Sequence, residues 1–130
     1  MGSAFFYKKH RKVIKDKILI NFDCVGDGEN IVTMADSKSR KDEIYPLFVD
    51  SLKQNEAGAN VIYLCKKMKW MMFPSDQLNF RKGIGVCSLK KSWIGYYVDK
   101  IHTYFDTNCR EENVAYLTKS MVGFISNLPV

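Results

Sequence analysis

The sequence predicts an α/β domain, a sandwich in which helices pack on a central sheet of about four strands. Two observations predict this class. Short apolar runs of strand length alternate along the chain with longer segments in which apolar residues recur at helical spacing. Glycine, aspartate and serine residues typical of turns separate these segments, and there is no internal repeat or low-complexity stretch. A chain of 130 residues is enough for one domain with a modest core.

The chain opens with a predicted helix that has no strand before it. Ser3 is placed to cap this helix, and Asp16 follows it. Its apolar residues recur at helical spacing and are Phe5, Phe6, Val13 and Ile14. Because an alternating sheet usually has more than about four strands, we expect the chain to begin inside a domain.

Two strands are predicted next. The run 18–22 is mostly apolar, as in a strand covered on both faces, and it ends at Asp23. Gly26-Asp27-Gly28 then turns the chain. The run 31–34 has the composition of the second strand.

A helix is predicted from Lys41 to Gln54, because the apolar residues of this segment fall on one helical face. They are Ile44, Leu47, Phe48 and Leu52. A third strand is predicted at 61–65. The segment 66–74, which contains Trp70, fits either a core or the lining of a cleft.

The remaining elements are a short helix, a strand and a long helix. Ser75-Asp76 is placed to cap a short helix that ends near Gly83, and 84–89 has the pattern of a fourth strand. Asn108 is placed to cap the last helix, with Glu111 at the capping-box position. This helix carries an apolar stripe and then meets a proline that cannot continue it: Val114, Leu117, Met121, Val122, Ile125, Leu128 and Pro129.

The net charge of +6 raises the question of a nucleic-acid partner. Basic residues are densest at 8–12 and continue at Lys15 and Lys17, all around the first predicted helix, so we interpret them as a solvated face. A phosphate-binding strip is the alternative. No RNA-binding signature, helix-turn-helix spacing or glycine-rich phosphate loop accompanies the cluster. We expect no nucleic-acid partner, and a small basic nucleic-acid-binding domain stays as an alternative function.

The cysteines and the apolar runs give little information about the cellular compartment of the protein. No apolar run approaches the roughly 18 residues needed to span a bilayer, so no membrane span is expected. The four cysteines are Cys24, Cys65, Cys87 and Cys109, and they form no C-x-x-C pair, which argues against a cysteine zinc site. Cys65 and Cys87 lie in apolar runs and are interpreted as buried, reduced thiols. The compartment stays open, with a lean to the cytoplasm.

Two positions carry residues with the chemistry of metal ligands. Asp23 ends the first predicted strand, and proteins of this class gather ligands at the carboxyl ends of strands. Its carboxylate either coordinates a metal or caps the following turn. His102 is one of two histidines and precedes the last helix. Neutral imidazole is the commonest metal ligand, although a histidine in a loop is also commonly solvated.

The order of motifs along the chain resembles metallopeptidase family 28, the co-catalytic zinc aminopeptidases that also include glutamate carboxypeptidase-like proteins. The resemblance covers residues 2–128, and its most specific motif is Ile-His-Thr-Tyr-Phe-Asp-Thr at 101–107. The other matching motifs are Gly2-Ser3 at a helix start, Asn-Phe-Asp-Cys-Val-Gly at 21–26 and Ser-Asp-Gln-Leu-Asn-Phe at 75–80. Gln77 stands where the family usually has a histidine, at a position that is not a zinc ligand.

The resemblance implies the three-layer α/β/α sandwich of the zinc exopeptidases, of which residues 1–130 would be one partial domain, the carboxy-terminal half. It implies two zinc ions, with Asp23 as a ligand to one and His102 as a ligand to the other. Residues that would support these ligands are Ser75, Asp76, Thr103, Asp106 and Thr107. Aromatic residues that are candidates for the pocket of the substrate's first side chain are Trp93, Tyr96 and Tyr97.

The resemblance also implies donors that this chain lacks. In the family a bridging carboxylate, a second imidazole, another carboxylate and a glutamate general base lie upstream of the residues matched by Gly2-Ser3. His10 and Glu29 are not placed to substitute for them. Two ligands, one for each ion, cannot hold zinc tightly, because such sites normally have three or four protein donors.

We therefore expect a fragment of a zinc-dependent aminopeptidase, whose parent hydrolyses amino-terminal peptide bonds of peptide substrates with a metal-activated water. The chain alone is expected to bind zinc weakly and to be inactive. The first alternative is a non-catalytic, peptidase-like interaction domain. An exposed sheet edge is expected to favour self-association.

Overall fold

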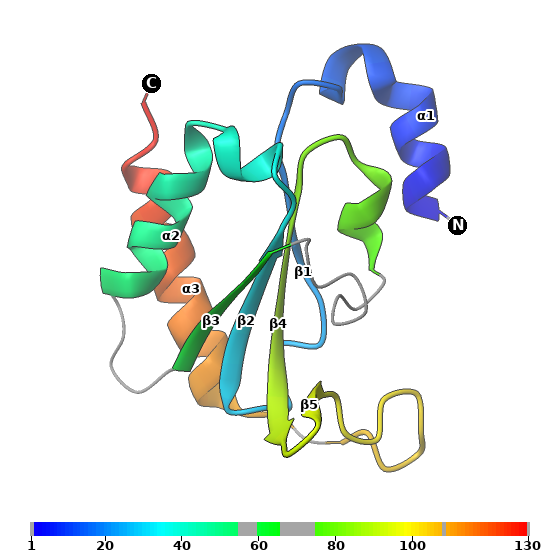
Figure 1. Ribbon diagram of the computed structural model, residues 1–130, viewed down its shortest axis with the longest axis vertical. Helices are drawn as coiled ribbons and strands as arrows, with labels where there is room; N and C mark the ends of the chain where they lie inside the picture. The colour runs from blue at the N-terminus through cyan, green and yellow to red at the C-terminus, as the bar shows by residue number, and fades with distance from the viewer. Residues whose placement is uncertain (1, 55–59, 66–74, 108, 130) are drawn as a thin grey trace.

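The computed structural model describes residues 2–54, 60–65, 75–107 and 109–129 of the chain. Helices and strands alternate around a mixed sheet, so the predicted α/β class is confirmed (Figure 1). In chain order the elements are α1 (Gly2–Ile14), β1 (Leu19–Phe22), β2 (Asn30–Ala35), the 3₁₀ turn η1 (Ser39–Lys41), α2 (Ile44–Gln54), β3 (Asn60–Cys65), the 3₁₀ helix η3 (Asp76–Asn79), β4 (Gly83–Ser92), β5 (Gly95–Tyr97) and α3 (Glu111–Ser126).

The strand order in the sheet is β1-β4-β2-β3, and β5 pairs with the end of β4. β1 runs parallel to β4, with Leu19 opposite Gly83, whereas β2 runs antiparallel to β4 and parallel to β3. All four strands predicted from apolar runs are present. The sequence pattern missed β5, because its three residues form only a short hairpin on the end of β4.

The alternation of side chains divides the core into two clusters, one on each face of the sheet. On the first face, Ile31 and Ala35 of β2 and Ile84 and Val86 of β4 pack against α2 and α3. From the helices this cluster receives Phe48, Leu52, Leu117 and Phe124. The second cluster consists of Val32, Met34, Cys87 and Leu89, with Ile62, Tyr96 and Val98 packed against it. Figure 1 shows α2 and α3 together on one side of the sheet and α1 on the other.

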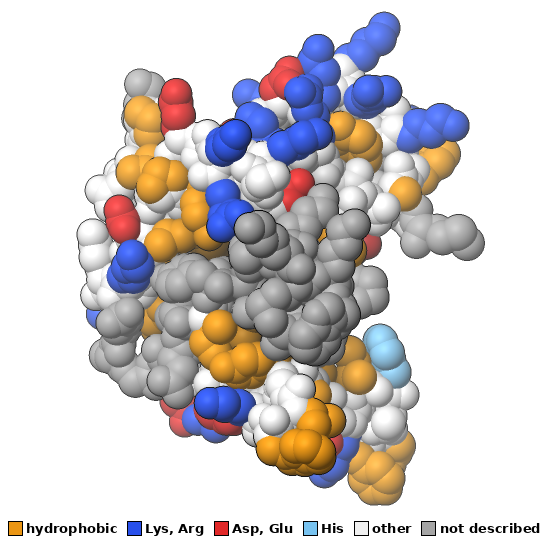
Figure 2. All heavy atoms as spheres, viewed as in Figure 1, with side chains coloured by type: hydrophobic (Ala, Val, Ile, Leu, Met, Phe, Trp, Pro, Cys, Tyr) orange, Lys and Arg blue, Asp and Glu red, His pale blue; other side chains and the backbone are white. Residues whose placement is uncertain are grey.

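Helix α1 differs from its prediction in two ways. It begins at Gly2, so Ser3 lies inside its first turn and is not its cap, and the Ser3 hydroxyl donates to Asp76 Oδ1 at 2.6 Å. None of its described residues is buried, and Phe5 and Val13 are 68% and 73% exposed. Its main ring contact is Tyr7 with Phe80, at 5.3 Å between centroids. Figure 2 shows lysine and arginine side chains gathered around this helix, as expected of a solvated basic face.

Helix α2 confirms the predicted buried face but starts later than Lys41. Phe48 and Leu52 are fully buried, and Ile44 and Leu47 pack against the same cluster. The backbone of Asp42 is extended, which separates the 3₁₀ turn from the helix. The Asp42 carboxylate then accepts the Ile44 backbone N–H at 3.1 Å, so it satisfies one of the free donors at the helix start.

Helix α3 begins at Glu111 with Arg110 as its N-cap, so the predicted capping box is wrong, and Asn108 itself lies outside the described residues. The predicted apolar stripe is confirmed in part: Leu117 is buried, and Met121 and Leu128 pack against the first core cluster. Val114, Val122 and Ile125 are exposed, and the other buried residues of the helix are Asn113, Ser120 and Phe124. The buried Asn113 side chain donates to the Gly28 carbonyl at 2.6 Å, and the Ser51 hydroxyl of α2 donates to the Ser120 backbone carbonyl at 2.7 Å.

No helix within the described residues is long and apolar enough to cross a bilayer. The predicted short helix after Ser75 is present as η3, with Ser75 as its N-cap residue. The Ser75 side chain makes no capping hydrogen bond. Its hydroxyl points instead to the end of β1, where the candidate site lies.

Candidate functional site

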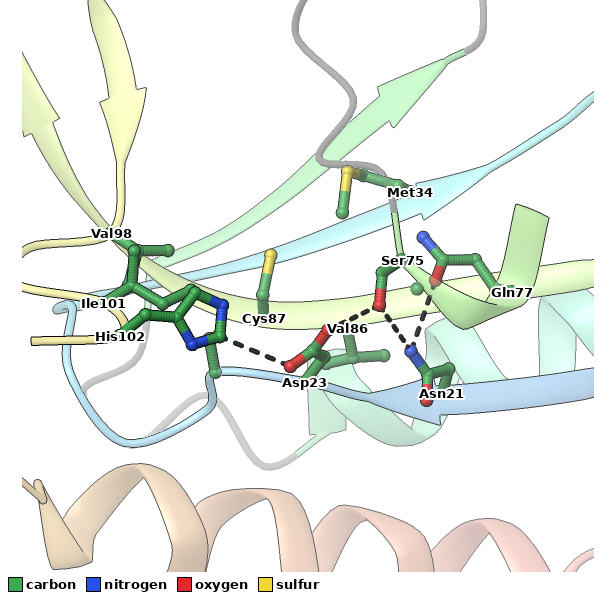
Figure 3. Close-up of a pocket in the computed structure, with 12 residues that line it drawn as sticks. Asn21, Asp23, Met34, Ser75, Gln77, Val86, Cys87, Val98, Ile101 and His102 are labelled. Carbon is green, nitrogen blue, oxygen red and sulfur yellow. Dashed lines mark hydrogen bonds between the residues drawn. The ribbon is translucent and has the colours of Figure 1, made fainter. Parts of the chain in front are cut away.

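A cavity of about 170 Å³ lies over the second face of the sheet, beside the carboxyl end of β1 (Figure 3). Five separate parts of the chain supply its walls: the end of β1, the strands β2 and β4, the start of η3, and the loop that follows β5. The lining residues are Asn21, Asp23, Cys24, Met34, Ser75, Gln77, Gly85, Val86, Cys87, Val98, Ile101 and His102. The walls therefore combine apolar side chains with ionisable and hydrogen-bonding groups.

Asp23 is held at the cavity by contacts on its backbone and on its side chain. Its backbone N–H donates to the Val86 carbonyl at 2.9 Å, which continues the pairing of β1 with β4. Its Oδ2 accepts the Ser75 hydroxyl at 2.5 Å, and its Oδ1 accepts the Cys24 thiol at 3.4 Å. Both oxygens of the Asp23 carboxylate therefore accept hydrogen bonds at the edge of the cavity.

His102 reaches the same cavity from the loop after β5. Its backbone φ is 61°, and Lys100 two residues earlier has φ 55°. Residues other than glycine seldom adopt this left-handed conformation, and where they do a local function often requires it. A turn stabilises it, because the backbone N–H and the hydroxyl of Thr103 both donate to the Lys100 carbonyl, at 3.0 and 2.6 Å. The structure thus brings together Asp23 and His102, which lie far apart in the sequence.

The buried carboxylate of Asp27 fixes the loop that carries His102. The Asp99 backbone N–H donates to Asp27 Oδ2 at 3.1 Å. Lys90 Nζ lies 3.3 Å from Asp27 Oδ1 and 2.9 Å from Asp99 Oδ2. The hydrogen bond from Lys90 lowers the pKa of Asp99, and the bond to Asp99 raises the pKa of Lys90. The sequence pattern identified Asp27 only as a turn residue, because the charges that it joins lie more than 60 residues further along the chain.

The residues expected to support the two ligands are only partly at the cavity. Ser75 lines it and binds Asp23 directly. Asp76 points away from it and accepts the Ser3 hydroxyl. The other three, Thr103, Asp106 and Thr107, are exposed on the His102 loop and do not line the cavity.

The three aromatic residues proposed for a substrate pocket lie on the β4–β5 hairpin. Trp93 is 96% exposed, Tyr97 is 42% exposed, and Tyr96 packs against the second core cluster. The structure does not bring any of the three into the cavity. The hydrophobic walls come instead from Met34, Val98 and Ile101, whose role a linear pattern does not distinguish from ordinary core packing.

Cys24 is a cavity residue that the sequence analysis did not single out. Its backbone φ is 52°, and burial and the adjacent Asp23 raise the pKa of its thiol to about 11. Cys87 also lines the cavity, is buried and unpaired, and burial raises its thiol pKa to about 12. This agrees with the prediction for Cys87, whereas the side chain of Cys65 lies outside the described residues.

Alkylation of Cys24 is expected to report on its contact with Asp23. The thiolate is the reactive form, so a raised pKa slows reaction with iodoacetamide at pH 8. Asp23→Asn removes the charge that disfavours the thiolate, so we expect the pKa to fall and Cys24 to react several-fold faster. The substitution does not change the burial of Cys24, which is the larger cause of its raised pKa. Peptide mass spectrometry measures the rate, and the exposed Cys109 is the internal control. Equal Cys24 rates in both proteins would contradict the contact.

The donor chemistry of the cavity fits zinc in part. A carboxylate and an imidazole, Asp23 and His102, are both common zinc ligands. Within the described residues, no group of three or more histidine, cysteine, aspartate or glutamate side chains is arranged to hold a metal ion. Two donors are fewer than a tight site requires, so further donors would have to come from elsewhere.

Comparison with known proteins found no match to a protein-family model, to a curated protein or to a solved structure.

Proposed function

We propose that this chain supplies part of a two-metal aminopeptidase site. In this proposal Asp23 is a ligand to one zinc ion and His102 is a ligand to its neighbour. The remaining donors and a glutamate general base come from outside these 130 residues, in a parent protein that hydrolyses amino-terminal peptide bonds. The observation that carries the proposal is that Asp23 and His102 line one cavity.

The arrangement of the elements supports the proposal. Asp23 follows the edge strand β1, the Ser75-Asp76 segment lies directly beside it, and the His102 loop joins β5 to the last helix. With α2 and α3 on one face and η3 and α1 on the other, we propose the three-layer sandwich of the zinc exopeptidases as the finer fold (Figure 1). The exposed apolar residues of α1 and the free edge of β1 within the described sheet are where further strands, or a second copy, would pack.

The residues of the cavity suit the role of metal ligands and their supports. The Ser75 hydroxyl donates to Asp23 Oδ2, which fixes the carboxylate and leaves lone pairs on both oxygens for a cation. The turn at Lys100 and Thr103 fixes the backbone that carries His102. When bound, zinc supplies Lewis acidity, which activates water near neutral pH and polarises a carbonyl group.

Zinc titration tests this proposal directly. We expect the chain to bind zinc weakly, because one carboxylate and one imidazole are an incomplete donor set. Asp23→Asn and His102→Gln should each weaken binding by about 10-fold or more, since each removes a charge or a donor. Isothermal titration calorimetry measures the affinity. An aminoacyl p-nitroanilide should show no turnover by the isolated chain.

The second histidine offers a matched control. His10 lies on α1, where its ring contacts Phe6 at 4.6 Å, away from the cavity. His10→Gln should leave zinc affinity unchanged. Zinc binding that depends on His10 and not on His102 would reject the proposed ligands. Fast turnover of the p-nitroanilide would reject the incomplete site, and a complete lack of zinc binding would favour the interaction-domain alternative.

A further inference from the structure

Gln77 carries a buried hydrogen-bond donor that has no acceptor among the described residues. The residue is 3% exposed and lines the cavity. Its Oε1 accepts from Asn21 Nδ2 at 3.2 Å, but its Nε2 makes no hydrogen bond within the part of the chain that the structure describes. An amide donor in this state is costly, and folded proteins usually provide such a group with a partner.

A chain of hydrogen bonds fixes which way the Gln77 amide faces. The Ser75 hydroxyl donates its single proton to Asp23 Oδ2. The Ser75 oxygen therefore accepts from Asn21 Nδ2, at 2.9 Å. Asn21 must then present its second N–H to Gln77, and only the oxygen of Gln77 can receive it. Rotating the Gln77 amide would bring two NH₂ groups together, so Nε2 is the end that faces away from Asn21 (Figure 3).

The free NH₂ group lies above a position with no side chain. A Cβ on Gly85 would come within 2.5 Å of Gln77 Nε2, so glycine is needed for the amide to lie there. Met34 is the neighbouring wall of the cavity and offers no strong acceptor. A small ligand in this cavity would thus lie beside one unused donor, that of Gln77.

We propose that Gln77 donates a hydrogen bond to an oxygen of the ligand that occupies this cavity. The site then selects a small ligand that places a carbonyl or carboxylate oxygen next to Gln77 over one that places a hydrocarbon of the same shape there. If this oxygen belongs to the side chain of the substrate's amino-terminal residue, that identification rests on the proposed function. The assignment of Gln77 as a hydrogen-bond donor to a ligand is independent of the proposed function.

A pair of similarly shaped amino acids, L-asparagine and L-leucine, tests the donor. Titration is followed by NMR of the ¹⁵N-labelled chain in the presence of EDTA. We expect asparagine to bind about 10-fold or more tightly than leucine, because a site built to hydrogen-bond an oxygen rejects the analogue that lacks it. The Gln77 side-chain NH₂ signals should move with asparagine and stay with leucine. Equal or tighter leucine binding, binding of neither probe, or unmoved Gln77 signals at saturation would overturn the proposal.

Substitution of Gln77 provides a second test of the proposed donor. Gln77→Met keeps the length of the side chain and removes the donor, so the preference for asparagine should disappear. Leu78→Met, on the exposed side of η3, is the control and should leave both affinities unchanged. An undiminished preference in Gln77→Met would overturn the proposal. If that variant does not fold, the NH₂ signals of the unmodified chain decide the question. EDTA removes metal from this experiment, so its failure and that of the zinc titration are separate results.

Discussion

Replacing Gly28 with alanine is expected to abolish stable folding of the chain. A Cβ at this position would lie 2.0 Å from the carbonyl carbon of Leu89 and 2.4 Å from its Cα. These are backbone atoms of β4, which pairs with strands on both sides and cannot move without breaking the sheet. The Gly28 carbonyl also accepts the buried hydrogen bond from Asn113. We expect a loss of about 3 kcal/mol or more in the free energy of unfolding, the upper end of the range for overpacking a core, because the atoms that clash belong to the backbone.

Gly123 provides a matched control, because a Cβ there would meet nothing within 4 Å. It lies in the interior of α3, where alanine has a higher helix propensity than glycine. Gly123→Ala is therefore expected to stabilise the chain by roughly 0.5–1 kcal/mol. Urea denaturation followed by circular dichroism compares both variants with the unmodified chain. A Gly28→Ala protein with an unchanged midpoint would show that β4 does not approach this turn as closely as described.

Replacing Phe48 with alanine is expected to cost about 3–5 kcal/mol of unfolding free energy. Phe48 is fully buried in the cluster that joins α2 and α3 to the sheet. Its ring meets that of Phe124 edge to face, with centroids 5.6 Å apart. The substitution removes this contact and leaves a cavity between three elements that are tied together and cannot close around it. The same urea experiment measures the loss.

Phe5→Ala is the control for Phe48→Ala, because it removes the same side chain from a site that is 68% exposed. We expect it to change stability by less than about 0.5 kcal/mol. A double-mutant cycle between Phe48 and Phe124 should give a coupling of about 0.5–1.5 kcal/mol for the ring pair. Similar losses of unfolding free energy for Phe48→Ala and Phe5→Ala would show that Phe48 is not part of the hydrophobic core.

Periodicity predicted those parts of the fold whose position depends on apolar burial. The four strands and the buried face of α2 are of this kind, because Phe48 and Leu52 are buried for the reason that their spacing indicates. The meeting of Asp23 with His102 was also expected from the motif order, and both line the cavity. A role for either residue in metal binding stays a prediction.

The parts that sequence reasoning missed depend on polar partners that are distant in the chain. Asn113 of α3 is buried with its side chain bonded to Gly28, whereas a hydropathy pattern treats asparagine as outward-facing. Asp27 acts through Lys90 and Asp99, and the free NH₂ of Gln77 can be recognised only once Asn21, Ser75 and Asp23 are in place. Helix α1 is present as predicted, but its apolar residues Phe5, Phe6 and Val13 are exposed. A sequence pattern contains no information about whether a partner covers such residues.

The position of β4 between β1 and β2 has a consequence for the order in which the molecule assembles. β1 and β2 are consecutive in the chain, yet neither can join the other until residues 83–92 have arrived to bridge them. Closing such long loops before any contact is gained slows folding. During synthesis the walls that enclose Asp23 would therefore form only after residues 83–102 have emerged, and a nascent chain that stops before Gly83 would contain the acidic residue without the pocket around it.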